Sequence, residues 1–139
     1  MKSIPLKKSE RGAAVVEFAI VAPLLLILLM GAVEFGLLFY NKQVLTNASR
    51  EGARAGISHL AAADITDIVE NYCDSRLIRF DTDTQPATTV TGAEGSYGDD
   101  LTVTVDYEYT FLVPGLLGFG PNLDLRAITV MKMEMPLGS

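Results

Sequence analysis

A single cysteine and a single histidine occur among the 139 residues, and this scarcity excludes several classes of protein. Cys73 alone cannot form an intramolecular disulfide or a metal site built on several thiolates. His59 belongs to no recognisable nucleophile motif, and the chain lacks a phosphate-binding glycine loop. We therefore predict that the protein is not an enzyme and binds no cofactor. Cys73 is expected in the core, and His59 at the surface or a helix end.

Acidic residues occur in short runs that lack the spacing of a metal-binding loop. These runs are Asp81-Thr82-Asp83 and Asp99-Asp100. A dedicated calcium loop places its oxygen ligands at several fixed positions, and neither run does so. We interpret both as solvated turns and predict no metal.

Basic residues are sparse beyond residue 12. Residues 1–12 carry a net charge of +3. Because the whole chain has a net charge of −6, residues 13–139 carry a net charge of −9. Nucleic acid is not an expected partner, because phosphate contacts need clustered Lys and Arg and only residues 1–12 hold such a cluster. We predict that residues 1–12 are a basic leader peptide.

A long apolar run follows the leader and has the length of a membrane span. Residues 13–40 contain only two charged side chains, Glu17 and Glu34. Because a bilayer core of roughly 30 Å needs about 20 helical residues, we predict a transmembrane helix over residues 13–40. The two carboxylates are about 25 Å apart along such a helix, so each can lie near one interface.

The positive charges before the run place the N-terminus in the cytoplasm and residues 41–139 outside it. A cleaved secretory signal peptide is less favoured. Its apolar run would be shorter, and a small-x-small cleavage site would follow it directly. The nearest such pattern here, Ala53-Arg54-Ala55, lies well downstream.

Glu17 stands five residues after Gly12, and a carboxylate so early in a membrane segment needs an explanation. A charge at the centre of a membrane helix costs ~2.5–3.5 kcal/mol on insertion scales. If the chain is cut between Gly12 and Ala13, Ala13 becomes a new amino terminus with Glu17 at its fifth position. The ammonium group and the carboxylate of adjacent copies can then neutralise each other, as in a type IV-like pilin.

Several positions along the helix suit close packing. The candidate helix-packing residues are Pro23, Ala32, Glu34, Gly36, Ala48, Gly52 and Gly56. Pro23 removes a helix hydrogen bond and predicts a kink, although proline is also common in membrane helices. Ala32 and Gly36 form a small-xxx-small pair.

Ala48, Gly52 and Gly56 repeat the four-residue spacing beyond the membrane. Gly52 inside a helix costs roughly 0.5–1 kcal/mol relative to alanine, so close packing is a plausible offset. The partner is either the protein's own sheet, which we favour for Gly52, or a neighbouring subunit. Gly56 is also a candidate for the end of the helix.

The remaining residues predict a small α+β ectodomain, which we place over residues 41–139. We expect helices at 41–57 and 64–79 and strands near 87–91, 100–112 and 123–134. Asp64 suits a helix N-cap, and Arg76 and Arg79 suit the C-terminal end. Strict alternation from Leu101 to Phe111 is the clearest strand pattern. Together these predict a second helix and a roughly three-stranded antiparallel sheet.

The link 112–121 is unusually apolar for a loop. Either it folds back over an edge of the core, which we favour, or it leaves a hydrophobic patch for a partner.

An ordered set of segments resembles the TadE family, minor pilins of the bacterial tight-adherence (Tad, Flp) pilus. The segments are Arg11-Gly12-Ala13-Ala14-Val15-Val16-Glu17-Phe18-Ala19, Pro23-Leu24-Leu25-Leu26, Glu34-Phe35-Gly36 and Leu45-Thr46-Asn47-Ala48-Ser49-Arg50-Glu51-Gly52-Ala53-Arg54. The similarity is specific over about residues 11–56. Phe18 departs from the tyrosine common in related pilins, which we interpret as harmless for processing.

The resemblance implies that a prepilin peptidase cuts between Gly12 and Ala13, and that Glu17 pairs with a neighbour's amino terminus. It further implies a single-pass protein of the bacterial inner membrane that helps to initiate or cap an adhesive pilus and becomes part of it. The implied partners are the prepilin peptidase, the major pilin, other minor pilins, inner-membrane assembly platform proteins and membrane lipid. The alternative is an uncleaved, membrane-anchored binding module of the cell envelope.

Overall fold

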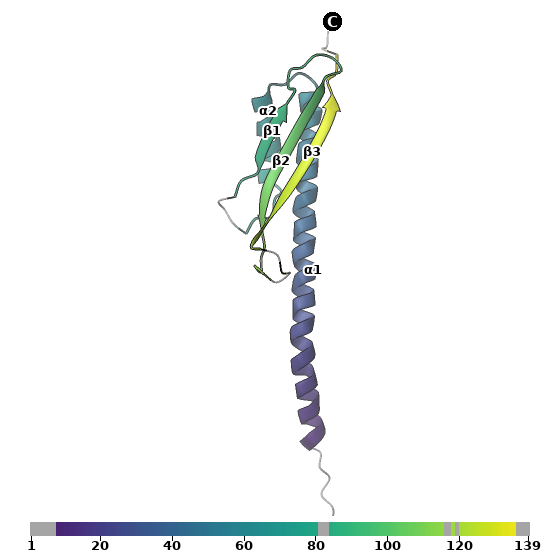
Figure 1. Ribbon diagram of the computed structural model, residues 1–139, viewed down its shortest axis with the longest axis vertical. Helices are drawn as coiled ribbons and strands as arrows, with labels where there is room; N and C mark the ends of the chain where they lie inside the picture. The colour runs from purple at the N-terminus through teal and green to yellow at the C-terminus, as the bar shows by residue number, and fades with distance from the viewer. Residues whose placement is uncertain (1–7, 81–83, 116–117, 119, 136–139) are drawn as a thin grey trace, which may run out of the picture.

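The computed structural model describes residues 8–80, 84–115, 118 and 120–135. It has an α+β fold in which one long helix extends far beyond a small domain (Figure 1). This confirms the predicted fold class. Residues 1–7 of the predicted leader lie outside the described residues.

The long helix α1 spans Lys8–Gly56, 49 residues or about 70 Å at the usual rise. It passes through Pro23 without interruption. The predicted segments 13–40 and 41–57 are therefore parts of one helix. That helix starts before Gly12, within the residues assigned to the leader.

The second helix α2 spans Ala62–Asp74, so the prediction of residues 64–79 was wrong at both ends. Ala61 occupies the N-cap with no side-chain hydrogen bond, and Asp64 lies within the first turn instead. The arginines lie beyond the C-terminal end and fold back onto its last turn. Arg76 lies 4.0 Å over the Tyr72 ring, and Arg79 pairs with Asp74 at 2.5 Å.

Three strands form one antiparallel sheet in the order β1-β2-β3. They are β1 (Ala87–Thr91), β2 (Asp100–Thr110) and β3 (Asn122–Lys132). All three lie close to the predicted ranges. In β2, odd-numbered residues are buried and even-numbered ones are more exposed, as the alternation predicted.

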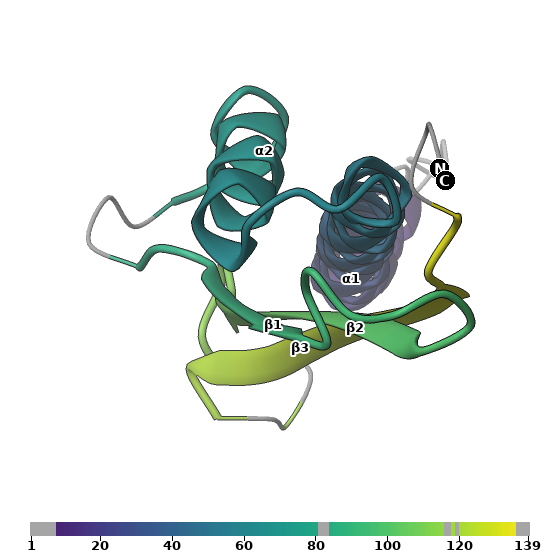
Figure 2. The same cartoon turned by 90° about the horizontal axis from the view of Figure 1, so that it is seen from above.

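Figure 2 shows both helices on one face of the sheet, which leaves the opposite face uncovered. Both helices and the central strand contribute fully buried apolar residues to the core: Leu45, Ala48 and Ala53 from α1, Ile65, Val69 and Cys73 from α2, and Leu101, Val103 and Val105 from β2. The prediction that Cys73 fills core space is thus confirmed. Burial raises the pKa of its thiol to about 11.

Candidate functional site: the length of α1

The N-terminal half of α1 projects away from the domain and is exposed along most of its surface (Figure 1). Its most apolar stretch is not buried by the rest of the chain, and it is long and apolar enough to cross a membrane. Leaving so many large apolar side chains in water would be costly, so their exposure calls for a nonaqueous environment or a partner. The N-terminal part of α1 therefore has the length and composition of a membrane anchor.

The predicted cleavage residues lie on this projecting part. Gly12 and Ala13 are exposed and helical, and a side chain at Gly12 would meet nothing within 4 Å. Glu17 is also exposed, one turn further along. It is the only charged residue between Ala13 and Val33. Nothing in the described part of this single chain approaches the cleavage site from outside the helix.

The predicted packing positions fall into two groups with different surroundings. Ala32 and Gly36 are exposed, and a methyl group at Gly36 would contact nothing within 4 Å. A methyl group at Gly52 would lie 2.4 Å from Val69 Cγ2, and one at Gly56 would lie 2.6 Å from Ile65 Cδ1. The second pair of glycines therefore lets α1 approach the protein's own α2 closely.

Ala48, which shares that spacing, is fully buried in the same core. The sequence favoured the protein's own sheet as the partner of Gly52. In the structure the nearest neighbour is Val69 of α2, and Val103 of the sheet would lie 3.6 Å from the added methyl group.

Gly56 has both predicted roles, as a close-packing position and as the end of the helix. The helix α1 ends at this residue, and a methyl group there would lie 2.6 Å from Leu101 Cδ2 as well as from Ile65 Cδ1.

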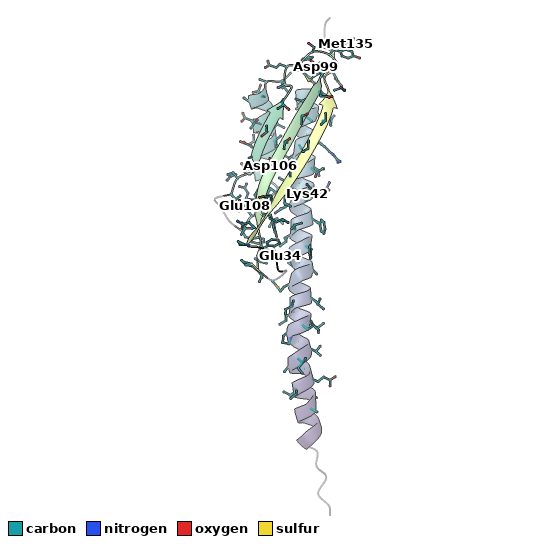
Figure 3. The ribbon with its side chains drawn as sticks, in the orientation of Figure 1. Glu34, Lys42, Asp99, Asp106, Glu108 and Met135 are labelled. Atoms are coloured by element: carbon teal, nitrogen blue, oxygen red, sulfur yellow. The ribbon has the colours of Figure 1, made fainter. Side chains whose placement is uncertain are left out.

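Glu34 lies where α1 meets the domain, and its side chain is only 1% exposed. Its Oε1 accepts hydrogen bonds from the Tyr109 hydroxyl at 3.0 Å and the Leu112 N–H at 2.8 Å. Its Oε2 accepts one from the Val113 N–H at 3.3 Å. The carboxylate thus fixes the end of β2 against α1 (Figure 3). We refer to these four residues as the Glu34 clamp.

The Glu34 clamp alters the chemistry of Tyr109. Burial and the hydrogen bond to Glu34 raise the pKa of this phenol above its ordinary value. A hydroxyl that stays protonated remains a hydrogen-bond donor to Glu34. The Tyr109 ring also meets Phe111 edge to face at 5.5 Å.

The position of Glu34 in the sequence predicts a place near a membrane interface but gives no indication of these partners. They lie 75 to 79 residues further along the chain. The favoured prediction for the 112–121 link is supported at its start, because Leu112 and Val113 fold back onto α1.

Other hydrogen bonds along α1 were also not predicted from the sequence. The Asn41 amide donates to the Ile78 carbonyl at 2.7 Å and accepts from the Ile78 N–H at 3.0 Å. Ser49 Oγ lies 2.8 Å from Thr129 Oγ1 on β3, and Lys42 donates to the Arg126 carbonyl. These contacts fasten the α2–β1 link and the sheet to one face of the helix.

His59 lies in the turn after α1, as expected, with its Nε2 3.0 Å from the Glu134 carbonyl oxygen. Among the described residues, no group of three or more His, Cys, Asp or Glu side chains could hold a metal ion. Arg50, Glu51 and Arg54 are exposed on α1.

Comparison with known proteins adds an assignment for most of α1. The sequence model of the family described as TadE-like protein matches residues 12–54. The chain carries a TadE-like region. That region contains Glu17, Glu34 and Gly52, and its end nearly coincides with the end of α1. No curated protein and no solved structure matched the chain.

The TadE-like region takes up 43 of the 139 residues, which is less than a third of the chain. It covers the exposed apolar part of α1 and the part of α1 that packs in the domain. The sheet and α2 lie outside the matched residues.

Proposed function

We propose that this protein is a minor pilin of the Tad pilus, cut by a prepilin peptidase between Gly12 and Ala13, that helps to initiate or cap the pilus. Its role is structural rather than catalytic and depends on helix packing between subunits. In the membrane, the N-terminus faces the cytoplasm and the domain lies on the opposite side of the inner membrane. The proposed partners are the peptidase, the major and other minor pilins and the assembly platform.

The observation that carries the proposal is the long exposed part of α1, in which Glu17 is the only charge from Gly12 to Val33, within a TadE-like region. Such a helix can lie in lipid before assembly and against other helices afterwards. A new ammonium group at Ala13 would give the Glu17 of a neighbour an opposite charge in a medium of low dielectric, where such a pair is stronger than in water. Ala32 and Gly36 would permit close approach of a partner helix.

Two substitutions separate processing from assembly. Gly12→Leu adds bulk at the residue before the proposed cut and is expected to abolish the mass loss corresponding to residues 1–12. Loss of the leader in this variant would refute the assigned site.

Glu17→Ala is expected to leave cleavage intact but to remove the protein from purified pili. Glu51→Ala, which removes a carboxylate from the exposed upper part of the same helix, is the matched control and should be incorporated normally. Normal incorporation of Glu17→Ala would contradict the pairing model.

A second candidate function rests on the helical conformation of the Gly12–Ala13 bond. Because α1 begins at Lys8, a peptidase would have to unwind its first turns to reach this bond in an extended form. If it does not, the chain remains an uncleaved, membrane-anchored binding module. A mature chain that keeps residues 1–12 and never enters pili would favour this function.

A further inference from the structure

The connection after β2 lies at the end of the domain nearest the exposed half of α1. Figure 1 shows β2 running toward the exposed half of α1, whereas the β1–β2 turn lies at the opposite end of the sheet. Within this connection, Leu112–Gly115 are described by the structure, and we refer to them as the basal segment. The basal segment is thus the part of the sheet region closest to the membrane anchor.

The Glu34 clamp fixes the height of the basal segment along α1. Residues 13–40 form about 42 Å of helix, whereas a bilayer core is roughly 30 Å thick. If the core begins near Ala13, about 20 residues bring the helix to its far boundary near Val33. Glu34 then lies at the boundary, and its hydrogen bonds hold the Leu112 and Val113 backbones at the same level.

The basal segment has the composition of a surface that contacts lipid. No charged residue occurs from Phe111 to Pro121. The Leu112 side chain is 41% exposed, and Pro114 is exposed beside it. The clamp satisfies the N–H groups of Leu112 and Val113, which removes part of the cost of placing backbone in an apolar medium.

The apolar surface of α1 continues to this level. Phe35 and Phe39 are exposed with their rings stacked 6.3 Å apart, and Tyr40 follows them. Aromatic side chains, tyrosine in particular, are favoured at the boundary between lipid and water. Leu112 therefore extends an apolar surface that the anchor itself presents to the bilayer.

We propose that the basal segment is a second membrane contact, in which Leu112 and Pro114 lie among the headgroups and upper acyl chains of the bilayer that α1 spans. This inference rests on the proposed membrane insertion of α1. A helix alone leaves the domain free to tilt and rotate, whereas a second contact sets its orientation on the membrane. Because the basal segment has no basic residue, zwitterionic lipid is a sufficient partner.

The chain has no tryptophan, so a single introduced tryptophan reports its own surroundings. The full chain carrying Leu112→Trp is reconstituted into phosphatidylcholine vesicles at high lipid excess, with bromines at chosen depths on the acyl chains. The emission should shift to shorter wavelength than in the unfolded chain. Quenching should be strongest when the bromines lie nearest the headgroups. Pro114→Trp, read in the same way, serves if Leu112→Trp fails to fold by circular dichroism.

Two variants calibrate the result. Val130→Trp replaces an apolar residue that is 55% exposed at the other end of the sheet, and it should show neither the shift nor the quenching. Leu25→Trp lies in the exposed part of α1 and should be quenched most by bromines near the bilayer centre.

The outcomes separate the two proposals. Quenching at Leu25 without quenching at Leu112 and Pro114 would overturn the membrane contact and leave the anchor intact. Absence of quenching at all three positions would overturn both. A shifted emission at Leu112 that bromines do not quench would mean that protein covers the basal segment, which also overturns the proposal.

Discussion

Replacement of Gly52 by alanine tests whether this glycine exists to let α1 approach α2. The added methyl carbon would lie 2.4 Å from Val69 Cγ2, 3.4 Å from Ile65 Cγ2 and 3.6 Å from Val103 Cγ1. Val69 is fully buried, and a valine in a helix has one strongly preferred rotamer, so it cannot turn aside cheaply. Overpacking of this kind costs ~1–3 kcal/mol.

The same substitution replaces a glycine inside a helix by alanine, which by itself should raise the free energy of unfolding by about 0.5–1 kcal/mol. The net expectation is therefore a loss of about 1–2 kcal/mol in the free energy of unfolding, because the overlap exceeds the gain in helix propensity. For a domain of this size that corresponds to a fall in Tm of roughly 5–15 °C.

The assay is unfolding of the full chain in detergent by guanidinium chloride, followed by circular dichroism. Gly36→Ala is the matched control, because it gains the same propensity on the same helix and meets nothing within 4 Å. It should leave stability unchanged or raise it. Adding Val69→Ala to Gly52→Ala should make the two losses less than additive. A Gly52→Ala variant at least as stable as the parent chain would show that this glycine is not needed for the close approach of α1 and α2.

Three further predictions concern buried polar and ionisable groups. Glu34→Gln replaces an acceptor oxygen of the clamp by a donor and should lower the free energy of unfolding by about 1–3 kcal/mol; unchanged stability in denaturant titrations would argue against the clamp. Asn41→Ala leaves the N–H and C=O of Ile78 unpaired, so hydrogen exchange near Ile78 should speed up, whereas Gln43→Ala on the exposed side of α1 should leave it unchanged. Burial raises the pKa of Cys73 from 9.0 to about 11, so its contribution to stability should be complete below pH 8 and should fall by ~2–3 kcal/mol as pH rises through 9 to above 11. In alkaline denaturant titrations, Cys73→Ala should reduce the loss of stability over this range.

Local periodicity was enough to predict most of the fold. The alternation from Leu101 to Phe111 placed β2 almost to the residue, because one face of the sheet is buried and the other is open. The continuous apolar run likewise predicted α1, although the structure starts it at Lys8 rather than Ala13.

The C-terminal end of α2 could not be predicted from the local sequence. Arg76 and Arg79 suited a helix C-terminus by charge, but the helix stops at Asp74. Beyond it, Ile78 forms two hydrogen bonds with Asn41, 37 residues earlier in the chain. A contact of that range outweighs a preference of a few tenths of a kcal/mol for a positive charge near a helix end.

The candidate site was also predicted only in part from the sequence. Gly12, Ala13 and Glu17 were identified from spacing along one segment, and the structure places all three on the exposed part of α1. The Glu34 clamp was not predicted because its partners lie far along the chain. The residues around Glu34 would look the same if its carboxylate were hydrogen-bonded to lipid headgroups instead of to a distant strand.

The most direct test of the proposed function is the intact mass of the wild-type protein recovered from native pili and, separately, from native membranes. We expect the pilus fraction to contain a chain that begins at Ala13. A pilus fraction in which the chain still carries residues 1–12 would contradict the proposed function.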